Sequence, residues 1–174
     1  MGAIAEGIDV HGHGVPARFL EEVRRSGLGG VKVEASEGRY VLTFPGKSPL
    51  RPVAGNMLQF EGRLGWLDEQ GMHQQLLAPW LDVDGQELPS ADGQEWVRQL
   101  NNAMAEAMAD SGRRLLPHAT VHLADPAGAA RELERAATTL GMTGCMIPTH
   151  FSQGKLAENR YDALWEAAQG RRVP

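Results

Sequence analysis

The stretch GIDVHGHGVP, residues 7–16, is the part of the sequence on which the fold depends. An apolar run leads into it, and two histidines, His11 and His13, flank a single glycine. In an extended strand, residues i and i+2 point to the same face, with their Cα atoms roughly 6.5–7 Å apart. Two imidazoles at this spacing can converge on one metal ion, and Gly12 removes crowding between them. The same residues also fit a Gly-rich turn that contains histidines, so the neighbouring elements must decide.

Predicted strands and helices alternate along the rest of the chain. Short apolar stretches predict strands, and they lie at residues 3–10, 72–80, 115–123 and 144–148. Apolar residues at helical spacing predict helices that begin near residues 16, 61, 92, 125 and 159. The stretches VKVEA and RYVLTF predict a hairpin around the tripeptide SEG, inserted after the first helix and followed by a Pro/Gly-rich loop.

Alternation of this kind is typical of a parallel sheet covered by helices. Four strand–helix units form half of an eight-stranded α/β barrel, a fold that typically needs about 250 residues in full. An open, doubly wound sheet of four strands is the alternative. In both folds the chemistry lies at the C-terminal ends of the strands, which is where His11 and His13 are expected.

Individual side chains are predicted to cap these helices or to lie on their buried faces. Asp92 and Glu95 resemble a capping box at the start of one helix. Asp125, followed by Pro126, predicts the start of another. The residues expected on the buried faces of the last two helices are Leu133, Ala137, Leu140, Tyr161, Leu164, Trp165 and Ala168.

The composition argues against several classes of protein. The 174 residues suffice for one domain with a sizeable core, and 42% hydrophobic with 22% charged residues indicates a globular chain. A net charge of −5 without a Lys/Arg cluster argues against a nucleic-acid partner. No apolar run is long enough to span a membrane, so no membrane partner is expected. The single cysteine, Cys145, suits a reducing, cytoplasmic environment.

The other histidines differ in their positions relative to the predicted strand ends. His122 ends the third strand of the alternating series and His150 follows the fourth, so both are candidates for additional metal ligands. Each also fits a loop histidine with a local hydrogen bond. His118 lies deeper on the same face as His122 and is interpreted as a satisfied core histidine, while His73 begins a strand at the end opposite to the chemistry.

Arg51, in the loop of the inserted segment, is a candidate for binding substrate. The dipeptides PL and PV flank it and would hold it in a fixed, extended segment. A guanidinium suits bidentate binding of a carboxylate. Its alternative is an ordinary solvated side chain, which is the interpretation favoured for Lys47. The sequence has neither a Gly-rich phosphate loop nor a GxSxG elbow.

Four segments, in order, carry a resemblance to a known family: IDVHGHGVP at 8–16, RLGWLDEQGMHQQLLAP at 63–79, LNNAMAEAMADSGRRLLPHATVHLADPAGAARELERA at 100–136 and LGMTGCMIPTHFSQGKLAENRYDALWEAA at 140–168. Together they resemble the amidohydrolase-related superfamily, in the branch containing aminocarboxymuconate-semialdehyde decarboxylase and the resorcylate decarboxylases. The resemblance implies a single domain over residues 1–174, a (βα)4 half of a TIM-type (β/α)8 barrel with a hairpin and loop insertion at 31–60.

The resemblance also implies a chemistry. Members of this branch mostly release CO₂ from an unsaturated or aromatic carboxylic acid, and relatives hydrolyse. His11 and His13 would be two ligands of a divalent metal, zinc or manganese. Arg51 would bind a carboxylate of the small-molecule substrate. Trp80 would line the pocket, although it also fits a packing residue in the loop.

The sequence departs from the family pattern at its end, where the fifth strand is expected to begin. By resemblance, a third metal-binding histidine, an acid/base histidine and a metal-binding aspartate belong to that strand and later ones. Three hypotheses follow. The chain is a truncated, inactive part of such an enzyme; or two copies form a dimer in which a second HGH stretch completes the metal site; or the chain is a metal-free interaction module.

Overall fold

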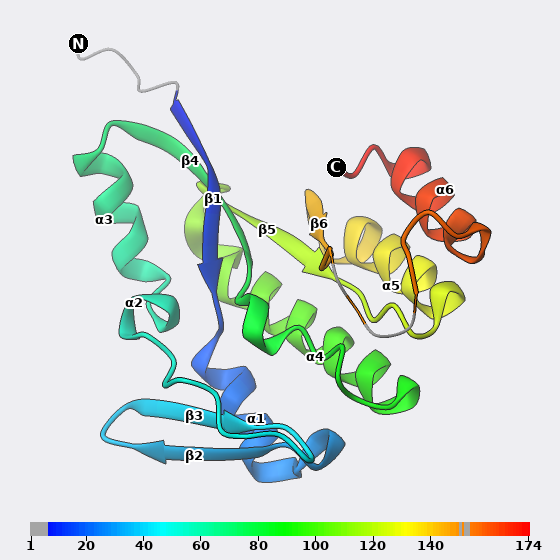
Figure 1. Cartoon of the computed structure of the whole chain (residues 1–174). Helices are drawn as coiled ribbons and strands as arrows, with labels where there is room; N and C mark the ends of the chain where they lie inside the picture. Colours follow the sequence, from blue (N-terminus) through cyan, green and yellow to red (C-terminus); the bar gives the residue numbers. More distant parts are fainter. Residues whose placement is uncertain (1–6, 150, 152–153) are drawn as a thin grey trace.

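A computed structural model describes residues 7–149, 151 and 154–174 of the chain (Figure 1). Its main sheet contains strands β1 (Gly7–Gly14), β4 (Met72–Pro79), β5 (Leu115–Thr120) and β6 (Gly144–Met146). The helices are α1 (Ala17–Ser26), α2 (Gly55–Leu58), α3 (Glu61–Glu69), α4 (Ser90–Met108), α5 (Pro126–Thr139) and α6 (Asp162–Arg171). Short 3₁₀ turns follow several of these elements, at Leu28–Gly30, Leu81–Val83, Ala109–Ser111 and Asn159–Tyr161.

The four strands are parallel and are ordered β1-β4-β5-β6 across the sheet. Each strand of the alternating series is therefore added on the same side of the one before. A doubly wound sheet reverses direction at a switch point, whereas a barrel does not. The strand order thus favours the half-barrel over the open alternative.

The predicted hairpin forms a separate two-stranded antiparallel sheet of β2 (Lys32–Ser36) and β3 (Arg39–Thr43). It lies next to α1, beyond the C-terminal end of β1 (Figure 1). Val33 and Leu42 of the hairpin are buried in the main hydrophobic cluster. The insertion therefore extends the core at the end of the sheet where the predicted site lies.

Trp96 of α4 is central to the larger of two hydrophobic clusters. Its ring meets Phe19 of α1 edge to face at 4.9 Å and Phe44 after the hairpin at 5.4 Å. Its indole N–H donates to the carbonyl oxygen of Val83 at 2.8 Å, which satisfies the polar atom inside the core. A second cluster joins α5 and α6, where the Tyr161 hydroxyl donates to the Leu123 carbonyl at 3.2 Å.

Two of the predicted helix starts have different outcomes. Asp125 caps α5 as predicted, because its carboxylate accepts a hydrogen bond from the Gly128 N–H at 3.0 Å. The capping box at residues 92 and 95 is wrong. Helix α4 begins at Ser90 without a side-chain cap, so Asp92 already lies in its first turn, and Glu95 pairs with Arg98 at 2.7 Å.

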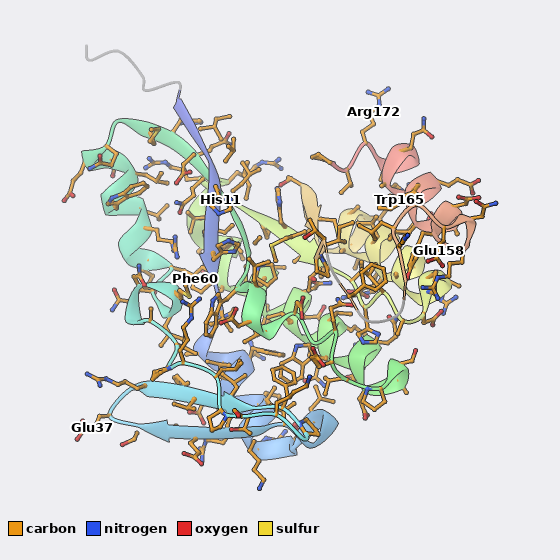
Figure 2. The ribbon with its side chains drawn as sticks, viewed as in Figure 1. His11, Glu37, Phe60, Glu158, Trp165 and Arg172 are labelled. Atoms are coloured by element: carbon orange, nitrogen blue, oxygen red, sulfur yellow. The ribbon has the colours of Figure 1, made fainter. Side chains whose placement is uncertain are left out.

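Of the residues predicted on the buried faces of the last two helices, Leu133, Tyr161 and Leu164 are buried, whereas Ala137, Leu140 and Ala168 are only partly buried and Trp165 is exposed. In α5, Ala136 is buried and Ala137 only partly. Trp165 of α6 is 38% exposed (Figure 2), with its indole N–H donating to the Leu156 carbonyl at 3.2 Å. The buried residues of α6 are Leu164, as predicted, and Ala167. None of the helices in the described ranges combines the length and the apolar character needed to cross a membrane.

Candidate metal centre

His11, labelled in Figure 2, and His13 lie inside β1, near its C-terminal end. Their imidazole rings are perpendicular, with centroids 4.9 Å apart. His11 is exposed and His13 is half-buried. The predicted pair is therefore brought together by the strand itself and not by a turn after it. Two imidazoles this close can bind one ion.

A hydrogen bond fixes which nitrogen of His13 is free. Its Nδ1 lies 3.1 Å from the carbonyl oxygen of Pro79, the last residue of β4. A carbonyl oxygen only accepts, so Nδ1 carries the hydrogen and Nε2 of the neutral ring presents its lone pair. Metal-binding histidines usually have this arrangement, because a partner on the second nitrogen sets the tautomer and the ring orientation.

Polar side chains support the two histidines from α3 and β4. Arg63 of α3 donates to the His13 carbonyl and, at 3.1 Å, to the amide oxygen of Gln75. The Gln75 amide then donates to one oxygen of Asp9 at 2.6 Å, and the other oxygen of Asp9 accepts from the His11 N–H at 3.1 Å. These residues were not predicted as part of the site. The only indication in the sequence is that Arg63 is the first residue of one of the four segments that resemble the family.

Arg51 and Trp80, which were both predicted to contact substrate, lie next to each other. The guanidinium carbon of Arg51 lies 5.2 Å from the centre of the Trp80 ring, over its face. Its Nε is 3.3 Å from a carboxylate oxygen of Asp82. Trp80 is only 3% exposed, and its main-chain N–H donates to the carbonyl of Gly14, the last residue of β1. Trp80 thus packs in the loop and supports an exposed Arg51.

His122 is not brought to His11 and His13. It lies after β5, fully buried, with its ring against the Cα of Gly93 in α4. Burial lowers the pKa of its imidazole, an effect that the Leu88 carbonyl and the charge of Asp125 oppose. Neither ring nitrogen makes a hydrogen bond of good geometry within the described part of the chain. His150, the other predicted additional ligand, lies outside the described residues.

His118 differs from the prediction in one respect. It is partly buried against Gly144 of β6, as a core histidine should be, but its Nε2 has no hydrogen-bond partner among the described residues. It is therefore not a satisfied histidine. Burial lowers the pKa of this imidazole, which favours its neutral form.

A family model described as amidohydrolase matches residues 8–174. The chain belongs to the amidohydrolase family. Among curated proteins, the chain is 29% identical to the gamma-resorcylate decarboxylase of Polaromonas sp. over 119 residues, which are 64% of this chain and 36% of that protein. It is 31% identical to a decarboxylase of Emericella nidulans over 88 residues, 49% of this chain and 27% of that one.

Solved structures show the same fold. The 5-carboxyvanillate decarboxylase of Sphingomonas paucimobilis matches with a TM-score of 0.73 and 22% identity, over 97% of this chain and 50% of that one. A dihydroxybenzoic acid decarboxylase of Polaromonas sp., with bound manganese and 2-nitroresorcinol, matches with a TM-score of 0.70 and 20% identity, over 98% and 48%. The predicted half-barrel is confirmed, and the chain spans about half the length of these structures.

The donor set of the chain fits part of a metal centre. His11 and His13 are neighbouring imidazoles at a strand end, and the hydrogen bond from Nδ1 leaves Nε2 of His13 free to bind. A catalytic zinc takes three protein ligands and one open position. Among residues 7–149, 151 and 154–174, no group of three or more His, Cys, Asp or Glu side chains is placed to hold an ion. The two histidines therefore account for two ligands only.

Proposed function

We propose that this chain carries two ligands of the metal site of a decarboxylase that acts on an aromatic carboxylic acid. The observation that supports this most is the geometry of His11 and His13, with the Nδ1 of His13 tied to Pro79 and its Nε2 free. The curated relatives are decarboxylases, and one related structure contains manganese. Manganese is accordingly the first choice of metal and zinc the second.

The proposed chemistry divides between a bound metal and the side chains of the chain. When bound, a divalent metal would supply Lewis-acid polarisation of substrate oxygens. His11 and His13 would hold it through imidazole nitrogens. Arg51, spread over the Trp80 ring, would bind the substrate carboxylate, and Asp82 would have to give up its contact with Arg51 to allow this. A small carboxylic acid is the partner that this set of groups suits.

The remaining metal ligands must come from outside the described residues. A longer form of the chain could supply them, or a second copy could do so in a dimer. The open edge of β1 would allow a copy to pair there. Against the dimer, the Cys145 N–H on β6 already donates to the Pro174 carbonyl at 3.0 Å, so a copy would have to displace that contact. A metal-free interaction module is the non-catalytic alternative.

Metal binding by histidine variants tests this proposal. We expect His11→Ala and His13→Ala each to weaken the affinity for Mn²⁺ and Zn²⁺ at least about ten-fold, because each removes one of two chelating nitrogens. His73→Ala is the matched control, since His73 is an exposed histidine at the opposite end of β4. Equilibrium dialysis with elemental analysis measures binding. Unchanged affinity in the His11→Ala, His13→Ala double variant would refute the metal site.

The same samples separate the two sources of additional ligands. Size-exclusion chromatography with light scattering gives the mass of the metal-bound species. One ion per dimer, with mass doubling on metal addition, would favour the shared site. One weakly held ion per monomer would favour a longer chain. A cytoplasmic location is proposed because Cys145, the single cysteine of the sequence, has no second cysteine with which to form an internal disulfide.

A further inference from the structure

Arg63 reaches from α3 to the C-terminal end of β1, where it contacts three groups. Its Nη2 donates to the main-chain carbonyls of His13 and, at 3.1 Å, Asn56. Its Nη1 donates to the Gln75 side chain. Half-burial lowers the pKa of the guanidinium, and the negative charge of Asp9 opposes that shift, so the group stays charged. A charged group held out of water in this way needs its partners to compensate for lost hydration.

Gln75 continues the contacts to the other histidine. It is almost fully buried, accepts from Arg63 and donates to Asp9. Asp9 in turn accepts from the main-chain N–H of His11. One connected set of hydrogen bonds therefore joins the main-chain carbonyl of His13 to the main-chain N–H of His11.

These contacts lie where the regular pairing of β1 is interrupted. The register of β1 against β4 shifts between Asp9 and Gly12, so the backbone of the intervening residues, including His11, does not follow the regular ladder. β1 is also an edge strand, with no other strand among the described residues on its second side. Side-chain hydrogen bonds thus hold the backbone at His11, where the register shifts, and also reach His13, which is itself in register with Ala78 of β4.

We propose that Arg63 and Gln75 are positioning residues that fix the backbone of β1 at His11 and His13 and thereby set the two imidazoles for joint metal binding. The inference rests on the proposed function, because it assigns these residues to the same metal site. Outer partners of metal ligands typically change affinity about 10–100-fold when they are lost.

The test compares Arg63 with Arg114, a matched arginine at the opposite end of the sheet. Arg114 also donates to two main-chain carbonyls, of Met72 and His73, both at 2.9 Å, and to the carboxylate of Asp68. We expect Arg63→Met to weaken Zn²⁺ affinity about ten-fold and Arg114→Met to leave it within about two-fold of the unmodified chain. Arg63→Lys keeps the charge and a donor, so it should recover part of the loss.

Electron paramagnetic resonance of bound Cu²⁺ gives a readout that general destabilisation does not move. Copper prefers imidazole nitrogen strongly, and its hyperfine pattern counts the nitrogens. We expect two in the unmodified chain and in Arg114→Met, and one in Arg63→Met. Gln75→Met, which keeps most of the side-chain volume, should act in the same direction as Arg63→Met and serves if the latter does not fold.

The outcomes separate the two proposals. If His11→Ala and His13→Ala leave metal affinity unchanged, the metal site itself is wrong. If those variants lose affinity while folded Arg63→Met and Gln75→Met bind Zn²⁺ as tightly as the unmodified chain with an unchanged Cu²⁺ spectrum, the site stands and the positioning role is overturned. Equal losses in Arg63→Met and Arg114→Met would also overturn it, because they would reflect stability alone.

Discussion

The His122 ring rests on the Cα of Gly93, in the first turn of α4, so tightly that no larger residue fits there. A Cβ at Gly93 would lie 2.3 Å from Nε2 of His122. Overpacking of this kind costs about 1–3 kcal/mol. We therefore expect Gly93→Ala to lower the free energy of unfolding by that amount, measured by urea denaturation.

Gly65 of α3 is the matched control for this substitution. It is also a helical glycine, but a Cβ there would meet nothing within 4 Å. Gly65→Ala should raise the free energy of unfolding by up to about 1 kcal/mol, because alanine loses less conformational entropy in a helix. If Gly93→Ala behaved like Gly65→Ala, the His122 ring would be free to move aside.

Individual site residues differed in how far the sequence could predict them. His11 and His13 follow from local spacing, since two residues on one strand face are neighbours in any fold. Arg63 could not be predicted, because its partner at His13 is 50 positions away and only the packing of α3 on the strand end joins them. Long-range hydrogen bonds of this kind leave no periodic signal in the chain.

Among the elements, the segment between β4 and α4 carries a buried carboxyl group. Burial raises the pKa of Asp84 from 3.8 to about 6, the Gln86 N–H lowers it, and the charges of Glu87 and Asp82 add to the rise. The folded protein thus binds the proton more tightly than the unfolded chain. Stability should be highest below about pH 4 with respect to this group and should fall between about pH 4 and 6.

Asp84→Asn tests this pH dependence. Asparagine keeps an acceptor for the Gln86 N–H but cannot ionise, so the variant should lose the decline and gain about 1–3 kcal/mol at pH 7. Glu87→Gln, at an exposed neighbour whose charge adds only a minor part of the rise, is the control and should retain most of the decline. Urea denaturation across pH 4–7 measures both. A decline that persists in Asp84→Asn must come from another group.

The boundaries and faces of elements show why sequence patterns succeed in part. Asp125 caps α5 through a contact three residues away, which the local pattern predicts. Asp92 fails as a cap because the preceding loop lets α4 start earlier, at Ser90. Trp165 fails as a core residue because α6 packs on a single partner helix and leaves its other side exposed. Local chemistry predicts contacts within a turn, whereas tertiary packing decides the rest.

At the scale of the whole molecule, the parallel sheet ends in an open edge at β1. Val10 is 71% exposed there and Ile8 48%. Exposed apolar edge strands promote self-association, and a lysine on the edge suppresses it. We expect the chain to associate with rising concentration and Val10→Lys to reduce this, measured by sedimentation velocity.

Leu81→Lys is the control for this substitution. Leu81 is as exposed as Ile8 but lies in a 3₁₀ turn and not in the edge strand, so its change should leave association as it was. Equal effects of the two lysines would point to general solubility and not to the edge. The alternation of strands and helices left two topologies, a half-barrel and an open sheet, whereas the strand order that separates them and the extent of edge exposure needed the structure.

Gly12 and the two histidines that flank it are under different constraints. Packing constrains the glycine, whereas the proposed metal site constrains the histidines. A Cβ at Gly12 would lie 2.7 Å from the Leu77 side chain and 3.1 Å from the Gln75 amide, so packing alone disfavours a larger residue there. His11 is exposed and His13 half-buried, and folding makes weaker demands on them. In a lineage that no longer needed the metal, we expect substitutions to accumulate first at His11 and His13. Gly12 would be retained longer, because packing still requires it.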